Sequence, residues 1–318
     1  MKPKKKIIVL GDIELGGGTI TDDFISDKAL SQLILSLAKE NKEIELVLNG
    51  DVFDFLLCPL IRSGKQYYER HITADVSLEK LDMILKSHKP VIEALSRFID
   101  DPRHKIVLTF GNHDHDLVFK EVQQKIKQTL GSNEQVVFSG LRYKTDGVYI
   151  EHGHQYDPTF RIEESRLTDI YKGKEILRLP MGAYGIMYDL MALKKKYSFS
   201  ERMHPRPFVL RKRLVFLSMY KMASFLFRYS FYLPLRHPND PTYRFPSDLW
   251  MAFWDKMKKY KWHITQYISV DDVTANFKRG KEPSKASESV YILGHTHEKM
   301  QSSKDGKIYI NPGGWADD

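Results

Sequence analysis

The sequence is poor in cysteine and has no long apolar segment near its amino terminus. One cysteine, Cys58, stands among the 318 residues, which excludes disulfides within the chain and predicts a reducing, cytoplasmic location. We expect Cys58 to be buried as a small apolar side chain. The basic residues 1–6 are followed by an apolar run at residues 7–10. This run is too short for a secretory signal and is interpreted as a strand.

The sequence also lacks a nucleotide-binding P-loop. Residues 16–18 are three successive glycines, but the Gly-Lys-Ser/Thr ending with which a P-loop holds phosphates and magnesium does not follow them. We therefore interpret this segment as a flexible rim.

Acidic residues are scarce in the middle of the chain. Residues 161–263 contain 21 Lys and Arg against 9 Asp and Glu, and 20 of the 38 aromatic residues of the chain. The remaining residues contain 28 basic and 32 acidic side chains, so the net charge of +8 comes from this middle segment. A basic, aromatic segment of this kind suits a packed cap with solvated charges, an anionic lipid surface or a nucleic acid.

The periodicity of the first half predicts an α/β fold. Apolar runs predict strands at residues 7–10, 44–48 and 106–110, alternating with helices at 27–40, 78–99 and 116–130. This βαβ order is typical of a parallel sheet. Further short strands are predicted at residues 136–138, 141–143, 148–151, 290–293 and 307–310, which indicates that the sheet structure continues in a mixed or antiparallel way.

After residue 158 the pattern changes to long helical segments. We predict helices at residues 162–179, 181–196, 207–233 and 248–269, followed by an exposed loop at 278–285. The apolar stretch 214–235 is interrupted by Lys221 and Arg228, which share one helix face, so we expect a helix on a surface and not a membrane span. The predicted organisation is a catalytic domain of residues 1–158 and 287–318 with a mostly helical insertion of residues 159–286.

Five short motifs place polar side chains at the ends of predicted strands. Asp51 follows the strand at residues 44–48, at the edge where open α/β sheets bind their ligands. A carboxylate can bridge two cations, and Gly50 before it permits a tight turn. The motifs are Gly11-Asp12-Ile13-Glu14, Gly50-Asp51-Val52-Phe53-Asp54, Gly111-Asn112-His113-Asp114, His152-Gly153-His154 and Gly294-His295-Thr296-His297.

In this order and spacing the motifs strongly resemble those of the calcineurin-like metallophosphoesterases, D-x-H, GD-x-x-D, GNHD/E, H and GH-x-H. The resemblance covers residues 7–157 and 288–315. It implies a four-layer αββα sandwich, with the insertion between the fourth and fifth motifs, and a phosphoesterase with two divalent metal ions. A hydroxide bridging the ions would attack the phosphorus in line. The implied ligands are Asp12, residue 14, Asp51 and His297 for one ion, and Asp51, Asn112, His152 and His295 for the other.

The resemblance also suggests which residues act on the substrate. His113 would be the general acid, and Asp114 would hold its imidazole in the right tautomer. His154 would contact the substrate, support a ligand or only fill space. The remaining candidates for supporting positions, each with hydrogen bonding or capping as the alternative, are Asp54, His115, Asp116 and Asp157. Residues 311–315 resemble the family's closing loop and are expected to pack the site.

One position departs from the family pattern, because Glu14 stands where the family has histidine. If Glu14 binds metal, three carboxylates and one imidazole hold that ion, which favours manganese, magnesium or iron(II) over zinc. If Glu14 turns away, that site is weak or empty. We predict ligation, and manganese as the metal.

The substrate is predicted more broadly. Within the family, the His-Gly-x motif followed by Asp157, the Gly-His-Thr-His ending and the insertion resemble UDP-2,3-diacylglucosamine pyrophosphatases. This implies an amphiphilic phosphate ester or pyrophosphate. Separately, Arg206, Arg211, Lys212 and Arg213 before the apolar stretch would suit anionic headgroups at the inner face of a membrane, with a packed helical cap as the alternative. The alternatives are a nuclease or phosphodiesterase, and a catalytically weak fold that serves as a binding scaffold.

Overall fold

The computed structural model describes residues 5–131, 134–157, 159–191, 224, 227–245, 288–304 and 306–315. The first half contains, in order, β1 (Lys6–Leu10), α1 (Asp27–Ala38), β2 (Ile44–Asn49), β3 (Leu60–Arg62), β4 (Lys65–Tyr67), α2 (Ala74–Ser87), α3 (Lys89–Phe98), β5 (His104–Thr109), the 3₁₀ turn η1 (His115–Val118), α4 (Lys120–Leu130), β6 (Val136–Gly140), β7 (Arg142–Thr145) and β8 (Val148–Glu151).

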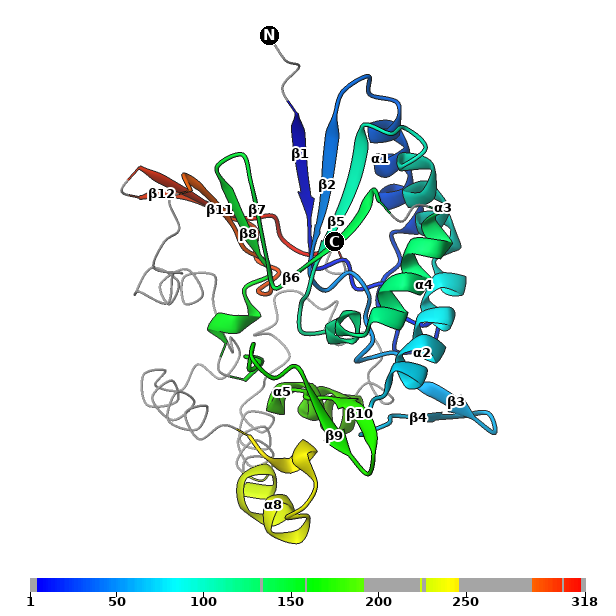
Figure 1. The fold of residues 1–318 in the computed structure, drawn as a ribbon, viewed down its shortest axis with the longest axis vertical. Helices are drawn as coiled ribbons and strands as arrows, with labels where there is room; N and C mark the ends of the chain where they lie inside the picture. Colours follow the sequence, from blue (N-terminus) through cyan, green and yellow to red (C-terminus); the bar gives the residue numbers. More distant parts are fainter. Residues whose placement is uncertain are drawn as a thin grey trace, which may run out of the picture.

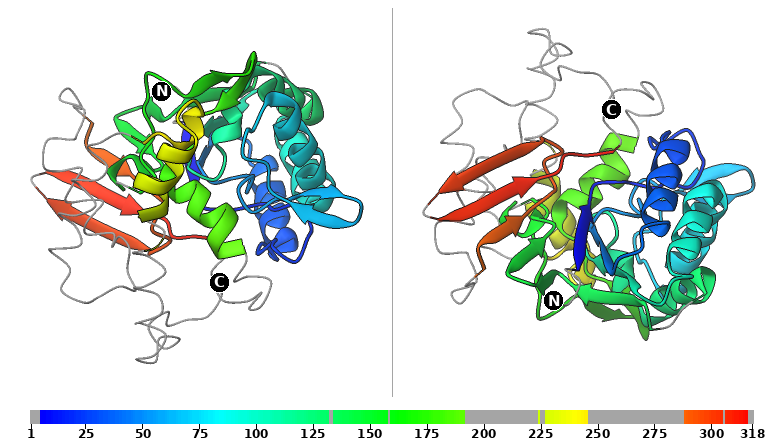
Figure 2. Two further views of the ribbon diagram at one scale, coloured as in Figure 1. Left: turned by 90° about the horizontal axis from the view of Figure 1, so that it is seen from below. Right: turned by 90° about the horizontal axis from the view of Figure 1, so that it is seen from above.

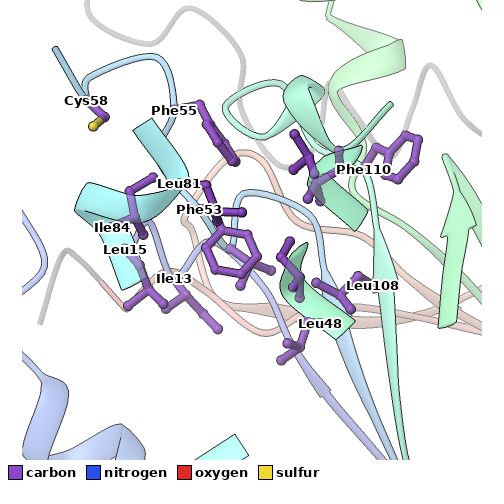
Figure 3. Close-up of a cluster of buried hydrophobic side chains, with 14 of the residues drawn as sticks. Ile13, Leu15, Leu48, Phe53, Phe55, Cys58, Leu81, Ile84, Leu108 and Phe110 are labelled. Carbon is purple, nitrogen blue, oxygen red and sulfur yellow. The ribbon is translucent and has the colours of Figure 1, made fainter. Parts of the chain in front are cut away.

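Four parallel strands form the first sheet, in the order β1-β2-β5-β6. Strand β2 lies between two others and all six of its residues are buried, which explains its continuous apolar sequence. Helices α1 to α4 cover one face of this sheet (Figure 1). The core between them contains Leu48, Leu108, Phe53 and Leu81 together with Cys58, which is buried as predicted (Figure 3).

The second sheet has the order β12-β13-β11-β8-β7 and joins distant parts of the chain. It contains β11 (Val290–Ile292), β12 (Met300–Lys304) and β13 (Lys307–Asn311), and β11 runs parallel to both β8 and β13. Val47 and Val107 of the first sheet pack against Ile150 of the second. Figure 2 shows the second sheet and the helices on opposite sides of the first sheet. The predicted α/β sandwich is confirmed, and the described residues form three of its layers.

Two helix predictions are wrong in detail. The predicted helix at 78–99 is two helices, α2 and α3, because Pro90 has no N–H to donate and its ring would clash with a carbonyl of the preceding turn. Residues 162–179 contain a hairpin of β9 (Thr168–Tyr171) and β10 (Lys174–Leu177) in place of a helix. Its two-residue turn is Lys172-Gly173, and both residues have positive φ, at 49° and 76°, as a tight hairpin turn requires.

The described part of the insertion also contains α5 (Met181–Gly185), a π-helical turn at Ile186–Leu190, a second one at Arg228–Tyr232, α8 (Leu233–Arg236) and a 3₁₀ turn at Pro241–Tyr243. The helix predicted from residue 181 is confirmed as far as Met191. The predicted helix at 248–269, the loop at 278–285 and the basic residues from 206 to 213 lie outside the described residues. Within the described residues, no helix combines the length and apolar character needed to cross a bilayer.

Candidate metal centre

Five strand ends, from both sheets, deliver the predicted ligands to one place. Asp12, Asp51 and Asn112 follow the parallel neighbours β1, β2 and β5, whose carboxyl ends share one edge of the first sheet. His152 follows β8 and His295 follows β11, which are parallel neighbours in the second sheet. The parallel pairing in each sheet therefore explains why motifs near opposite ends of the chain converge.

The loops that carry the ligands have an unusual backbone conformation. Positive φ angles between 50° and 74° occur at five of the seven predicted ligands, namely Asp12, Glu14, Asp51, His295 and His297. Such angles cost about 1–3 kcal/mol for a residue other than glycine and gather at functional sites. Glycine is required at position 50, because its φ is +70° and an added Cβ would lie 2.7 Å from Cβ of His152.

One group of ligand atoms is centred on His152. Its Nε2 lies 3.0 Å from Oδ2 of Asp51 and 3.2 Å from Oδ1 of Asn112. Its Nδ1 donates a hydrogen bond of 3.1 Å to the carbonyl oxygen of Asn49, which leaves Nε2 as the atom that can bind metal. Asp51, His152 and His295 each offer a ligand atom within 4.8 Å of the others.

A second group lies around Glu14. Nε2 of His297 is 3.5 Å from Oε1 of Glu14 and 3.5 Å from Oδ1 of Asp12. Glu14, Asp51 and His113 also offer ligand atoms within 4.8 Å of one another. Glu14 therefore points into the centre with the other predicted ligands, and the side chain is 9% exposed.

Burial and neighbouring charges shift the pKa values of these side chains. Burial raises the pKa of Glu14 to about 7, although His297 and His113 oppose it. Burial would lower the pKa of His152, but the carboxylates of Asp51 and Asp12 outweigh it and raise that pKa to about 9. Burial would likewise raise the pKa of Asp51, yet His152 and His113 hold it well below its usual range. Without metal, Glu14 and His152 therefore tend to hold protons, and a metal ion that binds at this site must displace these protons.

The donor set fits divalent metal ions. Asp12, Glu14 and Asp51 are buried, and the ion-pair partners that the described residues provide for them are all histidines. Burying three carboxylates close together without a lysine or arginine partner destabilises the folded protein unless a cation is present. Both ring nitrogens of the fully buried His154 also find no hydrogen-bond partner among the described residues. Its ring lies 5.4 Å from that of His152, centroid to centroid.

The structure differs from the prediction for Asp114. Its carboxylate accepts hydrogen bonds from the backbone N–H of Gly111, at 2.6 Å, and of Val52, at 2.9 Å. The bond from Gly111 lies within the loop after β5, and the bond from Val52 joins that loop to the loop after β2. Both oxygens of Asp114 are therefore used by backbone N–H groups and not by the imidazole of His113. Nδ1 of His113 donates instead to Oδ1 of Asp54, at 2.8 Å. Asp54 is therefore the residue that orients His113.

The imidazole of His113 is placed beside the ligands and is partly open. Its backbone N–H donates to Oδ1 of Asp51 at 2.8 Å, and its side chain is 12% exposed. Burial would lower the pKa of His113, but the carboxylates of Asp54, Asp51 and Glu14 outweigh it and raise that pKa well above the usual value.

The structure also places three other predicted residues, Asp157, Asp116 and His154. Oδ2 of Asp157 lies 3.2 Å from Nε2 of His295, so this carboxylate contacts a predicted ligand, and its supporting role stays a prediction. Asp116 accepts a 2.5 Å hydrogen bond from the hydroxyl of Ser77, in α2, which is the ordinary hydrogen-bonding role that was its alternative. His154 is buried within the centre.

Two contacts of the centre were not predicted from the sequence. Asn49 holds His152 through its carbonyl oxygen, and its position directly before Gly50 was the available signal. The ring of Phe160 lies edge-on to His295, with centroids 5.5 Å apart. No sequence pattern indicates that contact, because it depends on how the insertion packs.

One comparison with known proteins identifies a family for this chain. A model of the calcineurin-like phosphoesterase family matches residues 5–231. Among solved structures, the chain is similar to the crystal structure of a phosphopantetheinyl hydrolase from Mycobacterium tuberculosis, with 11% identity and a TM-score of 0.33 over 99% of this chain and 91% of that chain. A similarity at that level supports no inference about function. A search of curated proteins gives no match.

Proposed function

The chain belongs to the calcineurin-like phosphoesterase family and is a metal-dependent phosphoester hydrolase, and we propose that it acts with two divalent ions at this centre. The position of Asp51 carries the proposal. Asp51 belongs to both groups of converging ligand atoms, one with His152 and His295 and the other with Glu14 and His113. Its two oxygens can therefore serve two ions, which is the role the family motif assigns to it.

The proposed ligands divide as the resemblance implies. Asp12, Glu14, Asp51 and His297 would hold one ion. Asp51, Asn112, His152 and His295 would hold the other. Two such ions would neutralise charge on the phosphate and supply a hydroxide nucleophile at neutral pH.

His113 completes the proposed machinery. Its Nδ1–H is engaged by Asp54 at 2.8 Å, so its Nε2–H is available to protonate the leaving oxygen. The hydrogen bond from its backbone to Asp51 fixes the imidazole relative to the ligands. We assign the general-acid role to His113 on this geometry.

We propose manganese as the metal, with iron, magnesium and zinc as the alternatives. Glu14 supplies oxygen where the family has an imidazole nitrogen, and more oxygen donors favour harder cations. The support is that Oε1 of Glu14 lies 3.5 Å from Nε2 of His297, among the other ligands.

The test compares metal content and hydrolysis for the wild type, Asp51→Asn and Asp82→Asn. Asp82 is a matched control because its side chain is 61% exposed and pairs with Lys125 on the surface. After manganese reconstitution, the wild type and Asp82→Asn should bind two ions per chain and hydrolyse p-nitrophenyl phosphate or its bis ester. Asp51→Asn should lose at least one ion and at least 100-fold in rate. A wild type that binds one ion would contradict the dinuclear proposal.

For the substrate we propose an amphiphilic phosphate ester or pyrophosphate, of the kind that UDP-2,3-diacylglucosamine pyrophosphatases cleave. Support comes from the insertion, where Phe227, Phe231 and Leu235 are 59% to 81% exposed beside the exposed Arg228 and Arg236. Apolar side chains flanked by arginine suit acyl chains beside an anionic group, and contact with the inner face of a membrane.

A substrate comparison tests this choice. Micelles of a nucleotide-linked diacyl lipid should be hydrolysed faster than the same nucleotide sugar without acyl chains, and Phe227→Ser with Leu235→Ser should remove that difference. If single-stranded DNA or RNA is cleaved with strong salt dependence and the lipid is not, the enzyme is a nuclease.

We further propose that residues 1–158 and 287–318 form the catalytic domain and residues 159–286 the insertion. Support for this division is the pairing of β11 with β8, which returns the chain to the second sheet. The cytoplasmic location also stays a proposal and is based on the single, buried Cys58.

A further inference from the structure

A short turn that contains Asp157 and Phe160 lies between the predicted ligand His295 and helix α5 of the insertion. Asp157 and Phe160, from this turn, both contact the imidazole. Oδ2 of Asp157 is 3.2 Å from Nε2, and the Phe160 ring meets the imidazole at 73° with the centroids 5.5 Å apart. One contact is polar and the other apolar, so together they restrict both rotation and tilt of the ring.

The turn is itself hydrogen-bonded to α5. The backbone N–H of Gly182 donates to the carbonyl oxygen of Thr159 at 2.9 Å. The backbone N–H of Thr159 then donates to Oδ1 of Asp157 at 2.8 Å. A chain of hydrogen bonds therefore leads from α5 through Thr159 and Asp157 to His295.

A second connection is made by packing. A Cβ added at Gly182 would lie 2.6 Å from Cε1 of Phe160 and 2.9 Å from two further ring atoms. Gly182 has helical backbone angles, so space and not conformation requires glycine here. The helix backbone thus packs directly on the ring that contacts His295.

The opposite side of α5 is fixed to the loop before α2. The guanidinium of Arg70 lies 4.2 Å from the ring centre of Tyr184, in α5, and 3.5 Å from that of Tyr243. Arg70 also donates to the hydroxyl and the carbonyl oxygen of Thr242, at 2.8 and 2.7 Å. Cation–π contacts of this kind are attractive and hold the rings against the guanidinium. The helix α5 is therefore held between Arg70 and Phe160.

We propose that α5, through Gly182 and Phe160, positions His295, so that the insertion sets the metal affinity of one of the two sites. Phe160 and Gly182 are positioning residues and do not touch substrate. The inference rests on the proposed function, because it takes His295 as a metal ligand. It assigns to the insertion a role beyond substrate binding.

A double-mutant cycle tests the inference. Metal-free wild type, Gly182→Ala, Phe160→Ala and the double variant are each titrated with manganese by calorimetry and electron paramagnetic resonance, and their thermal unfolding is recorded without metal. Gly182→Ala and Phe160→Ala should each weaken one of the two sites by about tenfold and leave the other unchanged. With the ring absent, the added methyl should have no further effect on affinity.

The matched control is Gly173→Ala in the β9–β10 turn. It strains the insertion through its φ of +76°, but its methyl would meet no atom within 4 Å. Both manganese affinities should be unchanged in this variant.

Several results would overturn the inference. These are equal weakening of both sites, additive effects in the double variant, the same loss in Gly173→Ala, or no change in any variant. A wild type that binds no manganese would remove the proposed function and this inference together. A wild type with two sites whose affinities ignore Gly182 and Phe160 would remove the inference alone.

Discussion

Asp54 and Asp114 are both buried carboxylates near His113, yet the structure gives them different tasks. Oδ1 of Asp54 accepts from Nδ1 of His113 at 2.8 Å and from the backbone N–H of Leu57 at 3.0 Å. In Asp54→Asn the amide oxygen can keep both hydrogen bonds, so the substitution removes the negative charge alone. Asp114→Asn is different, because its two oxygens accept from two separate backbone N–H groups and an amide can satisfy one of them.

The expected magnitudes follow from these contacts. A hydrogen bond to a charged group contributes about 1.5–3 kcal/mol and a neutral one about 0.5–1.5 kcal/mol. Asp54→Asn should therefore cost about 1–2 kcal/mol in the step that needs a protonated His113, or roughly 5- to 30-fold in rate. Asp114→Asn should reduce the free energy of unfolding by about 1–3 kcal/mol, because one buried donor loses its acceptor.

The assay compares leaving groups. A general acid matters most when the leaving oxygen is basic, so Asp54→Asn should slow hydrolysis of an alkyl phosphate ester by about tenfold and that of p-nitrophenyl phosphate hardly at all. Bound manganese and urea unfolding are measured for every variant, so that loss of metal or of fold is recognised. If Asp114→Asn gives the leaving-group-dependent loss and Asp54→Asn does not, the assignment of Asp54 is wrong.

Three further predictions test other parts of the structure. His88 is buried between Asp22, at 3.0 Å, and Asp27, at 2.9 Å; burial would lower its pKa, but these carboxylates outweigh it and raise that pKa. The stabilisation by protonated His88 is therefore complete below about pH 6.5 and is lost as the pH rises through the raised pKa. In urea titrations of the metal-free wild type, the free energy of unfolding should fall over this pH range, and in His88→Gln this fall should be absent. Glu14→His, which restores the family residue, should increase the affinity for zinc relative to manganese by about tenfold, measured by competitive titration, and an unchanged ratio would mean that Glu14 is not a ligand. Arg70→Lys should lower the free energy of unfolding by about 1–2 kcal/mol, since an ammonium cannot stack between two rings, and equal stability by urea titration would show that the stacking is not stabilising.

Local sequence patterns were sufficient where one interaction dominates. The run of six residues in β2 is apolar because both faces of the strand are buried, and such a run predicts its own structure. The two-residue turn Lys172-Gly173 of the β9–β10 hairpin is also a local feature, because both residues adopt the positive φ that such a turn requires. The prediction of a helix over residues 162–179 is wrong because it follows the overall helical pattern of the segment and not this turn. The break between α2 and α3 was likewise marked by Pro90.

The sequence by itself determined which residues could form a metal centre, because the chemistry of metal ligation limits the residue types and the βαβ order places each motif at a strand end. The tertiary structure decided which role each of these residues has, because it sets which side chains are in contact. Which carboxylate orients His113 depends on the paths of the loops, because Asp114 accepts from the backbone of two loops and Asp54 accepts from the imidazole. The contact of Phe160 with His295 depends on the packing of α5, to which no local pattern refers. Local patterns are set by neighbours in the chain, whereas these assignments are set by neighbours in space.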